Sequence, residues 1–499
     1  MNSDRMGETQ LDCDVLVVGG GINGAGIARD AAGRGLRYLE HREFALVRKA
    51  LAERETLLRS APHIMRPLRF VMPHVNHGSG HRPAWLIRAG LFLYDRLAPR
   101  EFLQGSETVD LAAHRAGGPL KPGFTRGFVY SDGWVDDARL VVLNALDARE
   151  RGATVLTHTR ATSFERHPGH WMATLVHAGA GRRVKARCLV NAAGPWAGRV
   201  EQVALGTAPK RRLRLVKGSH IVVPRLFDHS YAYIFQHPDG RIVFAMPYEC
   251  AFTLIGTTDL EYQGDPDGVA IAATETGYLC ELANLYFRRQ LTPVDVVWSY
   301  SGVRPLLEDS AASAAAATRD YALGHDIGGA PLLSVLGGKI TTYRKLAEEA
   351  ADWIGTTLGQ PRPAWTAGAL LPGGDLFGST PSSRGVLEFD RWVTALGRRH
   401  AWLPPGLLLR WARAYGTRID TLLGTAACLQ DLGEEVAAGL YACELRYLVE
   451  HEWATCAADV LWRRSKLGLH LPPGCADDVD AWIAGQRRAA GAVAVTEPA

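Results

Sequence analysis

Glycines near the N-terminus are the residues whose type and spacing most clearly indicate chemistry. Gly19, Gly21 and Gly24 form a G-x-G-x-x-G pattern between an apolar run, Asp14-Val-Leu-Val-Val18, and a stretch with helical periodicity at 22–34. Glycines here allow a tight turn whose backbone can approach a pyrophosphate closely. The free N–H groups and the dipole at the start of the helix then attract the negative charge. Strand, motif and helix together predict a Rossmann-type dinucleotide site.

Such a site is expected to contain a second strand that ends, about 20 residues further on, in an acid bound to the ribose. By spacing, Glu40 is that acid. The preceding run, 36–39, is short for a central strand and continues directly into a helical stretch at 41–48. Spacing favours Glu40 as the ribose ligand and its surroundings argue against it, so both interpretations stay open.

Composition and charge exclude several classes of protein. The 499 residues are 47% hydrophobic and 22% charged, which is ordinary for a globular chain of two or three domains, and the net charge of +4 gives no reason to expect nucleic acid as a partner. The eight cysteines contain no C-x-x-C pair, so we expect reduced thiols, with no disulfide framework and no metal. No run reaches the roughly 18 apolar residues of a membrane span, and residues 1–10 lack a signal-peptide core, so any membrane contact is expected to be peripheral.

The elements that would position this site alternate between helices and strands. We expect strands at 153–158 and 187–191, a turn at 179–183 and an amphipathic helix between 136 and 151. Residues 213–260 alternate in the manner of an antiparallel sheet. The pattern predicts an α/β fold in which a Rossmann-type domain carries a second sheet.

A change of composition near residue 360 indicates a domain boundary. Proline and glycine punctuate 360–374, and the apolar spacing beyond this segment is helical, as at 408–415. We therefore expect 11–355 to form one domain, with interleaved nucleotide and substrate parts, and 366–499 to form an all-α C-terminal domain.

A series of motifs extends in order over nearly the whole chain. After the glycine-rich opening it continues as Arg37-Tyr-Leu-Glu-His41, Tyr130-Ser-Asp-Gly-Trp-Val-Asp-Asp-Ala-Arg139, Lys217-Gly-Ser-His-Ile-Val-Val-Pro224, Ile255-Gly-Thr-Thr-Asp259, Tyr300-Ser-Gly-Val-Arg-Pro305, Thr318-Arg-Asp-Tyr321, Gly337-Gly-Lys-Ile-Thr-Thr-Tyr-Arg344 and Tyr447-Leu-Val-Glu-His-Glu-Trp453. The series resembles the respiratory, FAD-dependent glycerol-3-phosphate dehydrogenase family. The resemblance implies a D-amino-acid-oxidase-like fold with an antiparallel-sheet substrate domain, FAD as cofactor and glycerol 3-phosphate as substrate.

The chain departs from the family pattern at one place. In the family, the first helix leads into a full second strand that ends in an acid, and a Ser/Thr-rich loop and a Gly-Gly pair follow. Here Leu36 is joined directly to Arg37, so this stretch is absent. Loss of a central parallel strand should expose apolar surface and unpaired backbone groups, at a cost of several kcal/mol. It also removes the expected ribose-binding acid, which puts FAD affinity and activity in question.

The reaction that the resemblance implies needs two kinds of side chain. Oxidation of glycerol 3-phosphate to dihydroxyacetone phosphate moves a hydride from C2 to the flavin, so a base must take the hydroxyl proton and cations must hold the phosphate. We favour His220 as the base because an ordinary histidine pKa lies near working pH; a structural sheet histidine is the alternative. Arg304 and Lys339 are expected at the catalytic centre, and Arg37 and Arg319 as substrate ligands, with a surface ion pair as the ordinary alternative for each arginine.

Three loops are expected to hold FAD. Besides the glycine motif, Asn191-Ala-Ala-Gly-Pro-Trp196 ends a strand in small residues that let the backbone approach a cofactor, although a simple turn is the alternative. Gly337-Gly-Lys-Ile-Thr-Thr342 can place N–H groups and a cation beside the flavin or the pyrophosphate. The predicted cofactor-binding residues are Gly19, Gly21, Asn23, Gly24, Ala193, Gly194, Gly338, Lys339 and Thr341.

The resemblance also implies that electrons leave to ubiquinone or a similar quinone. The run from Arg82 to Arg96 is an apolar helix edged with arginines, which suits an interfacial helix on anionic lipid; a helix packed on the protein core is the alternative. We expect a cytoplasmic protein in peripheral contact with the inner face of the membrane, with a homodimer as one arrangement. Two other interpretations remain: another FAD oxidase or dehydrogenase on the same fold, and a deletion-impaired paralogue without FAD or activity.

Overall fold

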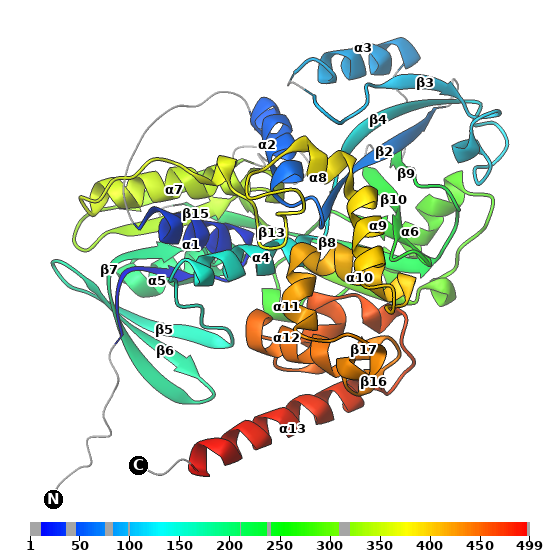
Figure 1. Cartoon of the computed structure of the whole chain (residues 1–499). Coiled ribbons are helices and arrows are strands. Elements are labelled where there is room, and N and C mark those ends of the chain that lie inside the picture. Colours follow the sequence, from blue (N-terminus) through cyan, green and yellow to red (C-terminus); the bar gives the residue numbers. More distant parts are fainter. Residues whose placement is uncertain are drawn as a thin grey trace, which may run out of the picture. The chain divides into compact units, whose positions relative to one another are not determined.

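A computed structural model describes residues 11–35, 46–74, 83–97, 100–209, 211–236, 241–308 and 320–496. The chain forms two compact units, each assembled from separate parts of the sequence (Figure 1). The first comprises Met1–Glu55, Pro67–Gly133 and Thr154–Trp365, and the second comprises Thr56–Arg66, Trp134–Ala153 and Thr366–Ala499. The second unit therefore includes two segments from the first half of the sequence.

The first sheet of the first unit is built on the predicted Rossmann start. β1 (Leu11–Val18) leads into α1 (Ile22–Arg34) and pairs in parallel with β7 (Ala180–Asn191), which pairs in parallel with β15 (Leu332–Gly337). Within the described ranges, antiparallel neighbours complete the sheet: β5 (Thr159–Arg166), β6 (Trp171–His177) and β14 (Tyr321–Asp326). The strand, tight turn and helix predicted at 14–34 are confirmed, and so is the strand at 187–191.

Helices cover both faces of this sheet and bury its apolar side chains. α1 and α7 (Tyr343–Thr357) lie side by side on one face, where Ile27, Val190 and Leu346 share a core (Figure 1). α5 (Ala197–Leu205) covers the opposite face, which buries Trp171 and Leu189. A sheet covered on two faces is the arrangement expected of parallel strands joined through helices.

β1 is less buried than the apolar run predicts. Asp12, Cys13 and Asp14 are exposed, and residues 15–18 are only half-buried. In the part of the chain that the structure describes, β1 pairs with β7 alone; residues 36–45, between α1 and α2 (Leu46–Ser60), lie outside it. β1 is thus an edge strand of the described sheet.

The second sheet confirms the antiparallel pattern predicted for 213–260. β8 (Leu213–Pro224) pairs with β13 (Trp298–Leu307) along one edge and with β11 (Phe252–Gly256) and β12 (Leu260–Glu261) along the other. The described sheet continues through β10 (Ile242–Tyr248), β9 (Ala232–Gln236), β2 (Met65–His74), β4 (Arg126–Val135) and β3 (Glu107–Asp110). α6 (Ala273–Tyr286) covers one face, where Leu279 and Ala283 share a core with Ile221 and Phe235.

Two predicted elements of the first half differ in the structure. The strand predicted at 153–158 is wrong, because this segment is irregular and β5 begins only at Thr159. The segment keeps an alternation of half-buried and exposed residues, but the ladder with β6 starts at Thr159, and an unpaired segment gains no strand hydrogen bonds. The turn predicted at 179–183 is shorter, since β7 begins at Ala180.

The second unit is mainly helical, as predicted for 366–499. It includes α4 (Asp137–Glu150), the helix predicted between 136 and 151, whose N-cap Asp136 accepts from the N–H of Arg139. Trp411, Leu445 and Val460 lie in its core. Its further elements are α8 (Ser383–Leu387), α9 (Phe389–Arg399), α10 (Pro405–Tyr415), α11 (Ile419–Leu423), α12 (Ala442–Glu452), α13 (Cys475–Thr496) and a hairpin of β16 (Glu435–Ala437) and β17 (Leu440–Tyr441).

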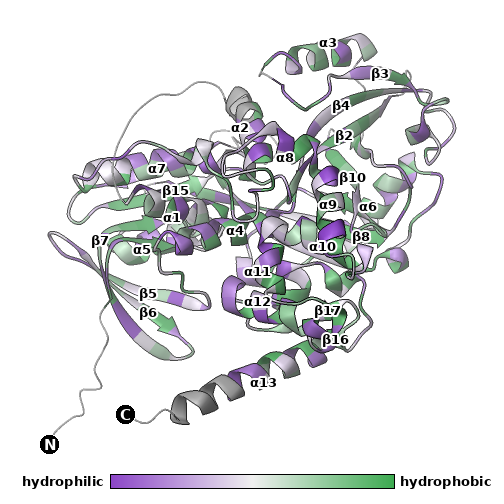
Figure 2. Cartoon of the chain, viewed as in Figure 1, coloured by the Kyte–Doolittle hydropathy of each residue, from purple (hydrophilic) through white to green (hydrophobic). Residues whose placement is uncertain are grey.

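α3 (Ala84–Tyr94), in the first unit, is apolar but does not belong to a core. None of its residues is buried, and Trp85, Phe92 and Leu93 are 71%, 51% and 60% exposed. Figure 2 shows the helix mainly in the colour of hydrophobic residues. Its other side is half-buried at Ile87, Leu91 and Tyr94, so a helix packed on the protein and an interfacial helix both stay open. Among the described helices, none is both long and apolar enough to cross a membrane.

Candidate functional site

The parallel strands of the first sheet bring the three predicted loops to one edge. β1 ends at Val18, directly before the glycine motif; β7 ends at Asn191, before Ala193 and Gly194; and β15 ends at Gly337. The carboxyl ends of parallel strands share one edge, and ligands of open α/β sheets bind there.

The glycine motif is too tight for side chains at two of its positions. Gly19 has φ +122°, and a Cβ on it would lie 2.2 Å from the carbonyl oxygen of Ala192. A Cβ on Gly24 would lie 2.0 Å from the carbonyl oxygen of Gly19. Gly21 is the N-cap of α1, and beyond its own chain neighbours and helix backbone no atom of the described residues lies within 4 Å of where its Cβ would be, so the described turn is open at the start of the helix. This is the arrangement that a pyrophosphate at a helix N-terminus requires.

The other two loops close against this motif. Asn23 Nδ2 donates to the carbonyl oxygen of Gly337 at 3.3 Å, and a Cβ on Gly338 would lie 3.2 Å from the same nitrogen. Asn23 Oδ1 is buried and accepts no hydrogen bond from the described residues, so it can accept one from a ligand. Lys339 is the N-cap of the short helix η5 (Ile340–Thr342), which contains Thr341.

The phosphate end of this cradle therefore fits a dinucleotide, because the tight glycine turn leads into the N-terminus of α1. The ribose end has no such support, because Glu40 lies outside the described residues, as do the predicted substrate ligands Arg37 and Arg319. In the same described ranges, no group of three His, Cys, Asp or Glu side chains could hold a metal ion.

The predicted base and a predicted phosphate ligand lie on paired strands. In the register of β13 against β8, Tyr300 is opposite His220 and Arg304 is opposite Val216. The rings of His220 and Tyr300 stack with centroids 4.8 Å apart, and a Cβ on Gly218 would lie 2.5 Å from the Arg304 guanidinium. Since residues two apart on a strand share a face, His220 and Arg304 face the same side of the sheet.

Arg304 is held by two residues for which no role was predicted. Its Nη1 donates to Asp259 Oδ1 at 2.8 Å, and its Nη2 donates to Thr257 Oγ1 at 3.1 Å. The Arg304 side chain is 34% exposed, and these two hydrogen bonds orient its guanidinium. Both partners stand in the motif at 255–259, where an acid beside hydroxyl residues was the signal that could have identified them.

The ring of His220 is neutral near pH 7. Burial, and secondly the positive charge of Arg304, lower the pKa of His220 to about 4. Its Nδ1 is buried and has no hydrogen-bond partner among the described residues. A neutral imidazole of this kind can accept a proton, which is the property that a general base needs.

The two parts of the site adjoin each other. A Cβ on Gly337 would lie 3.6 Å from the carbonyl oxygen of Pro305, the residue after Arg304. The short helix η2 (Gly194–Trp196) also packs against β13. The structure therefore places the loops at Gly194 and Lys339 next to the strand that carries Arg304.

Comparisons with known proteins agree with this fold. The model of the FAD dependent oxidoreductase family matches residues 34–344, and the model of the C-terminal domain of alpha-glycerophosphate oxidase matches residues 365–475. The X-ray structure of the glycerol-3-phosphate dehydrogenase from Bacillus halodurans complexed with FAD has a TM-score of 0.75 and 28% sequence identity to this chain, and covers 96% of this chain and 91% of that one. The predicted fold class is confirmed.

Two sequence relatives extend over nearly the full length. The glycerol-3-phosphate dehydrogenase of Pseudomonas aeruginosa is 51% identical over 489 residues, which cover 92% of this chain and 93% of that protein. The D-erythritol 1-phosphate dehydrogenase of Brucella abortus is 44% identical over 488 residues, with 92% and 95% covered.

The lengths of these alignments agree with a missing segment. The alignment with the Pseudomonas protein has 489 positions, whereas 92% of the 499 residues of this chain is about 459, so roughly 30 positions of the relative have no counterpart here. This total is large enough to include a strand and a loop such as the family pattern has between Leu36 and Arg37.

Proposed function

Because this chain belongs to the FAD-dependent glycerol-3-phosphate dehydrogenase family, we propose that it oxidises sn-glycerol 3-phosphate to dihydroxyacetone phosphate with FAD as hydride acceptor. The main structural support is the placement of Arg304 and His220 on one face of β8 and β13, beside the glycine loops. A cation for a dianionic phosphate and a neutral base for a hydroxyl are the two groups that this reaction needs.

Arg304 binds the phosphate in this proposal. A planar guanidinium can donate two parallel hydrogen bonds to one phosphate group. Asp259 and Thr257 orient the guanidinium before substrate arrives, so that little side-chain entropy is lost on binding. Lys339 contributes a second positive charge from the N-cap of η5, and Arg37 and Arg319 are proposed as further ligands.

His220 takes the proton of the C2 hydroxyl. With a pKa of about 4 it is a weak base in the free protein. A phosphate dianion on Arg304 offsets the positive charge that helps to lower this pKa, so the ring becomes more basic when substrate is bound. Bound FAD supplies the hydride acceptor. We propose that it is held by Gly19, Gly21, Asn23, Gly24, Ala193, Gly194, Gly338, Lys339 and Thr341.

The visible absorption spectrum of the purified protein tests the proposal, followed by anaerobic addition of glycerol 3-phosphate. We expect flavin absorption that the substrate bleaches, whereas unphosphorylated glycerol leaves it unchanged. A colourless protein that also fails to take up added FAD would support the deletion-impaired paralogue instead. Flavin that only an amino acid bleaches would support another oxidase on the same fold.

A second substrate is supported by the relative from Brucella abortus. Its 44% identity and near-complete coverage make D-erythritol 1-phosphate, a longer phosphorylated polyol, the alternative. Arg304 and His220 serve either substrate, because both contain a phosphate and hydroxyl groups. The ratio of the two kcat/KM values decides between them, and a higher value for D-erythritol 1-phosphate would reassign the substrate.

We also propose a membrane quinone, such as ubiquinone, as electron acceptor and peripheral contact of a cytoplasmic protein with the inner face of the membrane. The support is α3, whose Trp85, Phe92 and Leu93 are exposed, with the guanidinium of Arg96 3.6 Å from the Phe92 ring centroid. Exposed aromatic and aliphatic side chains beside arginine suit the interface of an anionic membrane.

The homodimer and the domain division at 11–355 and 366–499 remain proposals. Light scattering tests the homodimer, and limited proteolysis tests the domain division.

A further inference from the structure

We infer that Glu275 is a positioning residue for the substrate site, which it supports from the opposite face of the sheet by holding together the three segments that carry His220, Tyr300 and the partners of Arg304. The inference rests on the proposed function, since it concerns the same site. Glu275 lies on the first turn of α6 and does not itself face the substrate side.

Glu275 is a buried carboxylate, 3% exposed, that accepts several hydrogen bonds. The hydroxyls of Ser219 and Thr258 donate to its Oε1 at 2.8 and 2.7 Å, and the N–H of Ala272 donates to Oε2 at 2.9 Å. Lys217 Nζ lies 2.5 Å from Oε2. Burial alone would raise the pKa of Glu275, but the hydrogen bonds from Lys217, Ala272, Thr258 and Ser219 outweigh it and lower the pKa. The carboxylate is therefore charged near pH 7.

The residues of the Glu275 hydrogen-bond network are sequence neighbours of the substrate-site residues on the same strands. Ser219 precedes His220 on β8, and Ser301 follows Tyr300 on β13. The two serines are opposite each other, with hydroxyl oxygens 2.8 Å apart. Because successive side chains of a strand point to opposite faces, the serines lie on the α6 side while His220 and Tyr300 stack on the other.

Thr258 extends this network to the segment that holds Arg304. Its hydroxyl donates to Glu275 and accepts from the N–H of Ser219 at 2.9 Å. Its two neighbours in sequence, Thr257 and Asp259, are the partners of the Arg304 guanidinium. The buried charge thus joins β8 to the 257–259 segment directly and reaches β13 through the Ser219 hydroxyl, and charge-assisted hydrogen bonds in a buried place are strong enough to fix this geometry.

Glu275→Gln tests this role, because an amide keeps the shape but cannot accept hydrogen bonds at both ends. The measurement is the dissociation constant of dihydroxyacetone phosphate, by titration calorimetry on the FAD-loaded protein, which requires no turnover. We expect a weakening of about 10- to 100-fold, the loss typical of hydrogen bonds to a charged group. FAD content should not change.

Glu444→Gln is the matched control. Glu444 is equally buried, accepts from Arg410 and Tyr415, and belongs to the second unit. We expect it to lower the melting temperature as much as Glu275→Gln does, yet to change product binding less than about twofold. Equal losses of binding in the two variants would overturn the inference, since they would reflect general destabilisation.

A double-mutant cycle with Arg304→Lys tests the route of action. If Glu275 acts by fixing Arg304, Glu275→Gln should weaken binding clearly less in the Arg304→Lys background than in the wild type, and additive effects would overturn the inference.

If Glu275→Gln does not fold, Thr258→Val replaces it in both experiments, as it removes one hydroxyl of the network at nearly constant shape. A wild-type protein that binds FAD but neither product nor substrate overturns the proposed function, and the inference with it. Tight binding that survives in Glu275→Gln and Thr258→Val overturns the inference alone.

Discussion

At the scale of single residues, substrate binding depends on the guanidinium of Arg304. Arg304→Lys keeps the charge but removes the planar pair of donors, so we expect KM for glycerol 3-phosphate to rise about 10- to 100-fold, as for the loss of charge-assisted hydrogen bonds. Steady-state kinetics with a dye as electron acceptor measures it. FAD content serves as the control and should not change. An unchanged KM would mean that the phosphate is bound elsewhere.

The lowered pKa of His220 leads to a prediction about how the stability of the protein depends on pH. Its pKa is lowered from 6.5 to about 4 in the folded protein, so between these values the unfolded chain binds the proton more strongly. The contribution of His220 to stability is therefore complete above pH 6.5 and is lost as the pH falls toward 4. We expect His220→Asn to lose less stability than the wild type between pH 7.5 and pH 4.5. Chemical unfolding at several pH values measures the difference, and parallel curves would contradict the lowered pKa.

Elements explain features that single residues do not. β1 has the sequence of a central strand but the exposure of an edge strand, because the only strand paired with it in the described sheet is β7. The apolar residues at 15–18 should lie fully buried once a second strand adjoins them.

A segment of the family type, with a second strand that ends in an acid, provides the corresponding experiment. Inserting it between Leu36 and Arg37 should restore a neighbour for β1 and an acid for the ribose, and should raise both the melting temperature and the affinity for FAD. We expect FAD to bind at least about 10-fold more tightly, the worth of one hydrogen bond to a charged group. Fluorescence titration of the apoprotein measures it, with Glu40→Gln in the uninserted chain as the companion variant. If that variant loses FAD binding, Glu40 already supplies the acid.

α3 is an element whose sequence and exposure lead to a prediction about membranes. Trp85→Ser together with Leu93→Ser removes two of its exposed apolar side chains and should weaken binding to vesicles of anionic phospholipid at least about 10-fold, since full burial of each would contribute about 1.5–3 kcal/mol. Co-sedimentation with vesicles measures it. Val294→Ser is the matched control, because Val294 is 94% exposed but lies outside α3. Equal effects of the two changes would contradict a specific role of α3.

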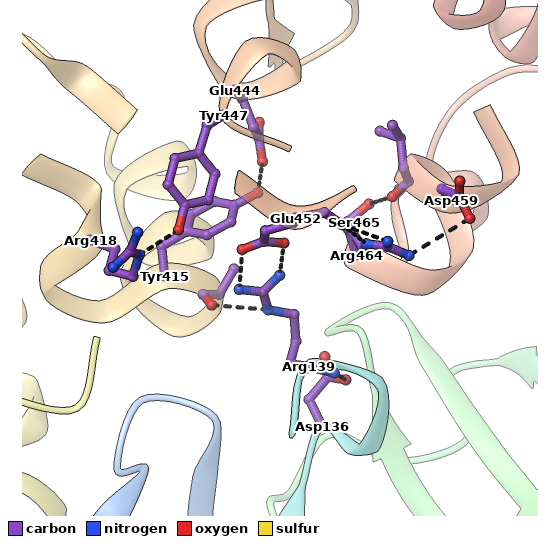
Figure 3. Close-up of polar contacts among 12 residues, drawn as sticks. Asp136, Arg139, Tyr415, Arg418, Glu444, Tyr447, Glu452, Asp459, Arg464 and Ser465 are labelled. Carbon is purple, nitrogen blue, oxygen red and sulfur yellow. Dashed lines mark hydrogen bonds and ion pairs between the residues drawn. The ribbon is translucent and has the colours of Figure 1, made fainter. Parts of the chain in front are cut away.

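At the scale of the whole molecule, the chain separates into a unit that carries the candidate site and a mainly helical unit with its own polar network. Figure 3 shows that network. The guanidinium of Arg139, from α4, faces the carboxylate of Glu452 in a two-pronged ion pair, and its Nε donates to the carbonyl oxygen of Ala414 at 3.1 Å. Arg464 donates to the carbonyl oxygen of Glu452. The pair thereby fixes α4, from the first half of the sequence, among the C-terminal helices.

Glu452→Gln would leave the charge of Arg139 buried without a counter-ion. Both side chains are at most 1% exposed, so we expect this change to destabilise the second unit by about 3–5 kcal/mol. Differential scanning calorimetry should show an unfolding transition at a lower temperature than in the wild type. Flavin absorption, which depends on the first unit, should be retained at temperatures below this transition. Glu388→Gln, in an exposed ion pair with Arg384, should leave the transition nearly unchanged. A single, unshifted transition would contradict this assignment.

The sequence by itself determined those features that depend on neighbours in the chain. The glycine motif, α1, α4, the antiparallel pattern at 213–260 and the helical end of the chain each follow from local periodicity or from the steric needs of a few adjacent residues. The stretch missing between Leu36 and Arg37 was instead inferred from the family resemblance. His220, Arg304 and Lys339 were chosen through a resemblance, and the structure brings His220 and Arg304 to one face and the loop of Lys339 next to it.

Only the tertiary structure decided which residues act together. Asp259 and Thr257 became partners of Arg304 because β13 pairs with β8 beside the end of β11, a register that no local pattern contains. The irregular segment at 153–158 and the exposure of β1 depend on whether a neighbouring strand is present, since a strand is stable only when its backbone groups are paired. The pKa of His220 and the buried charge of Glu275 were equally out of reach of sequence, because burial and contacts between distant residues set both.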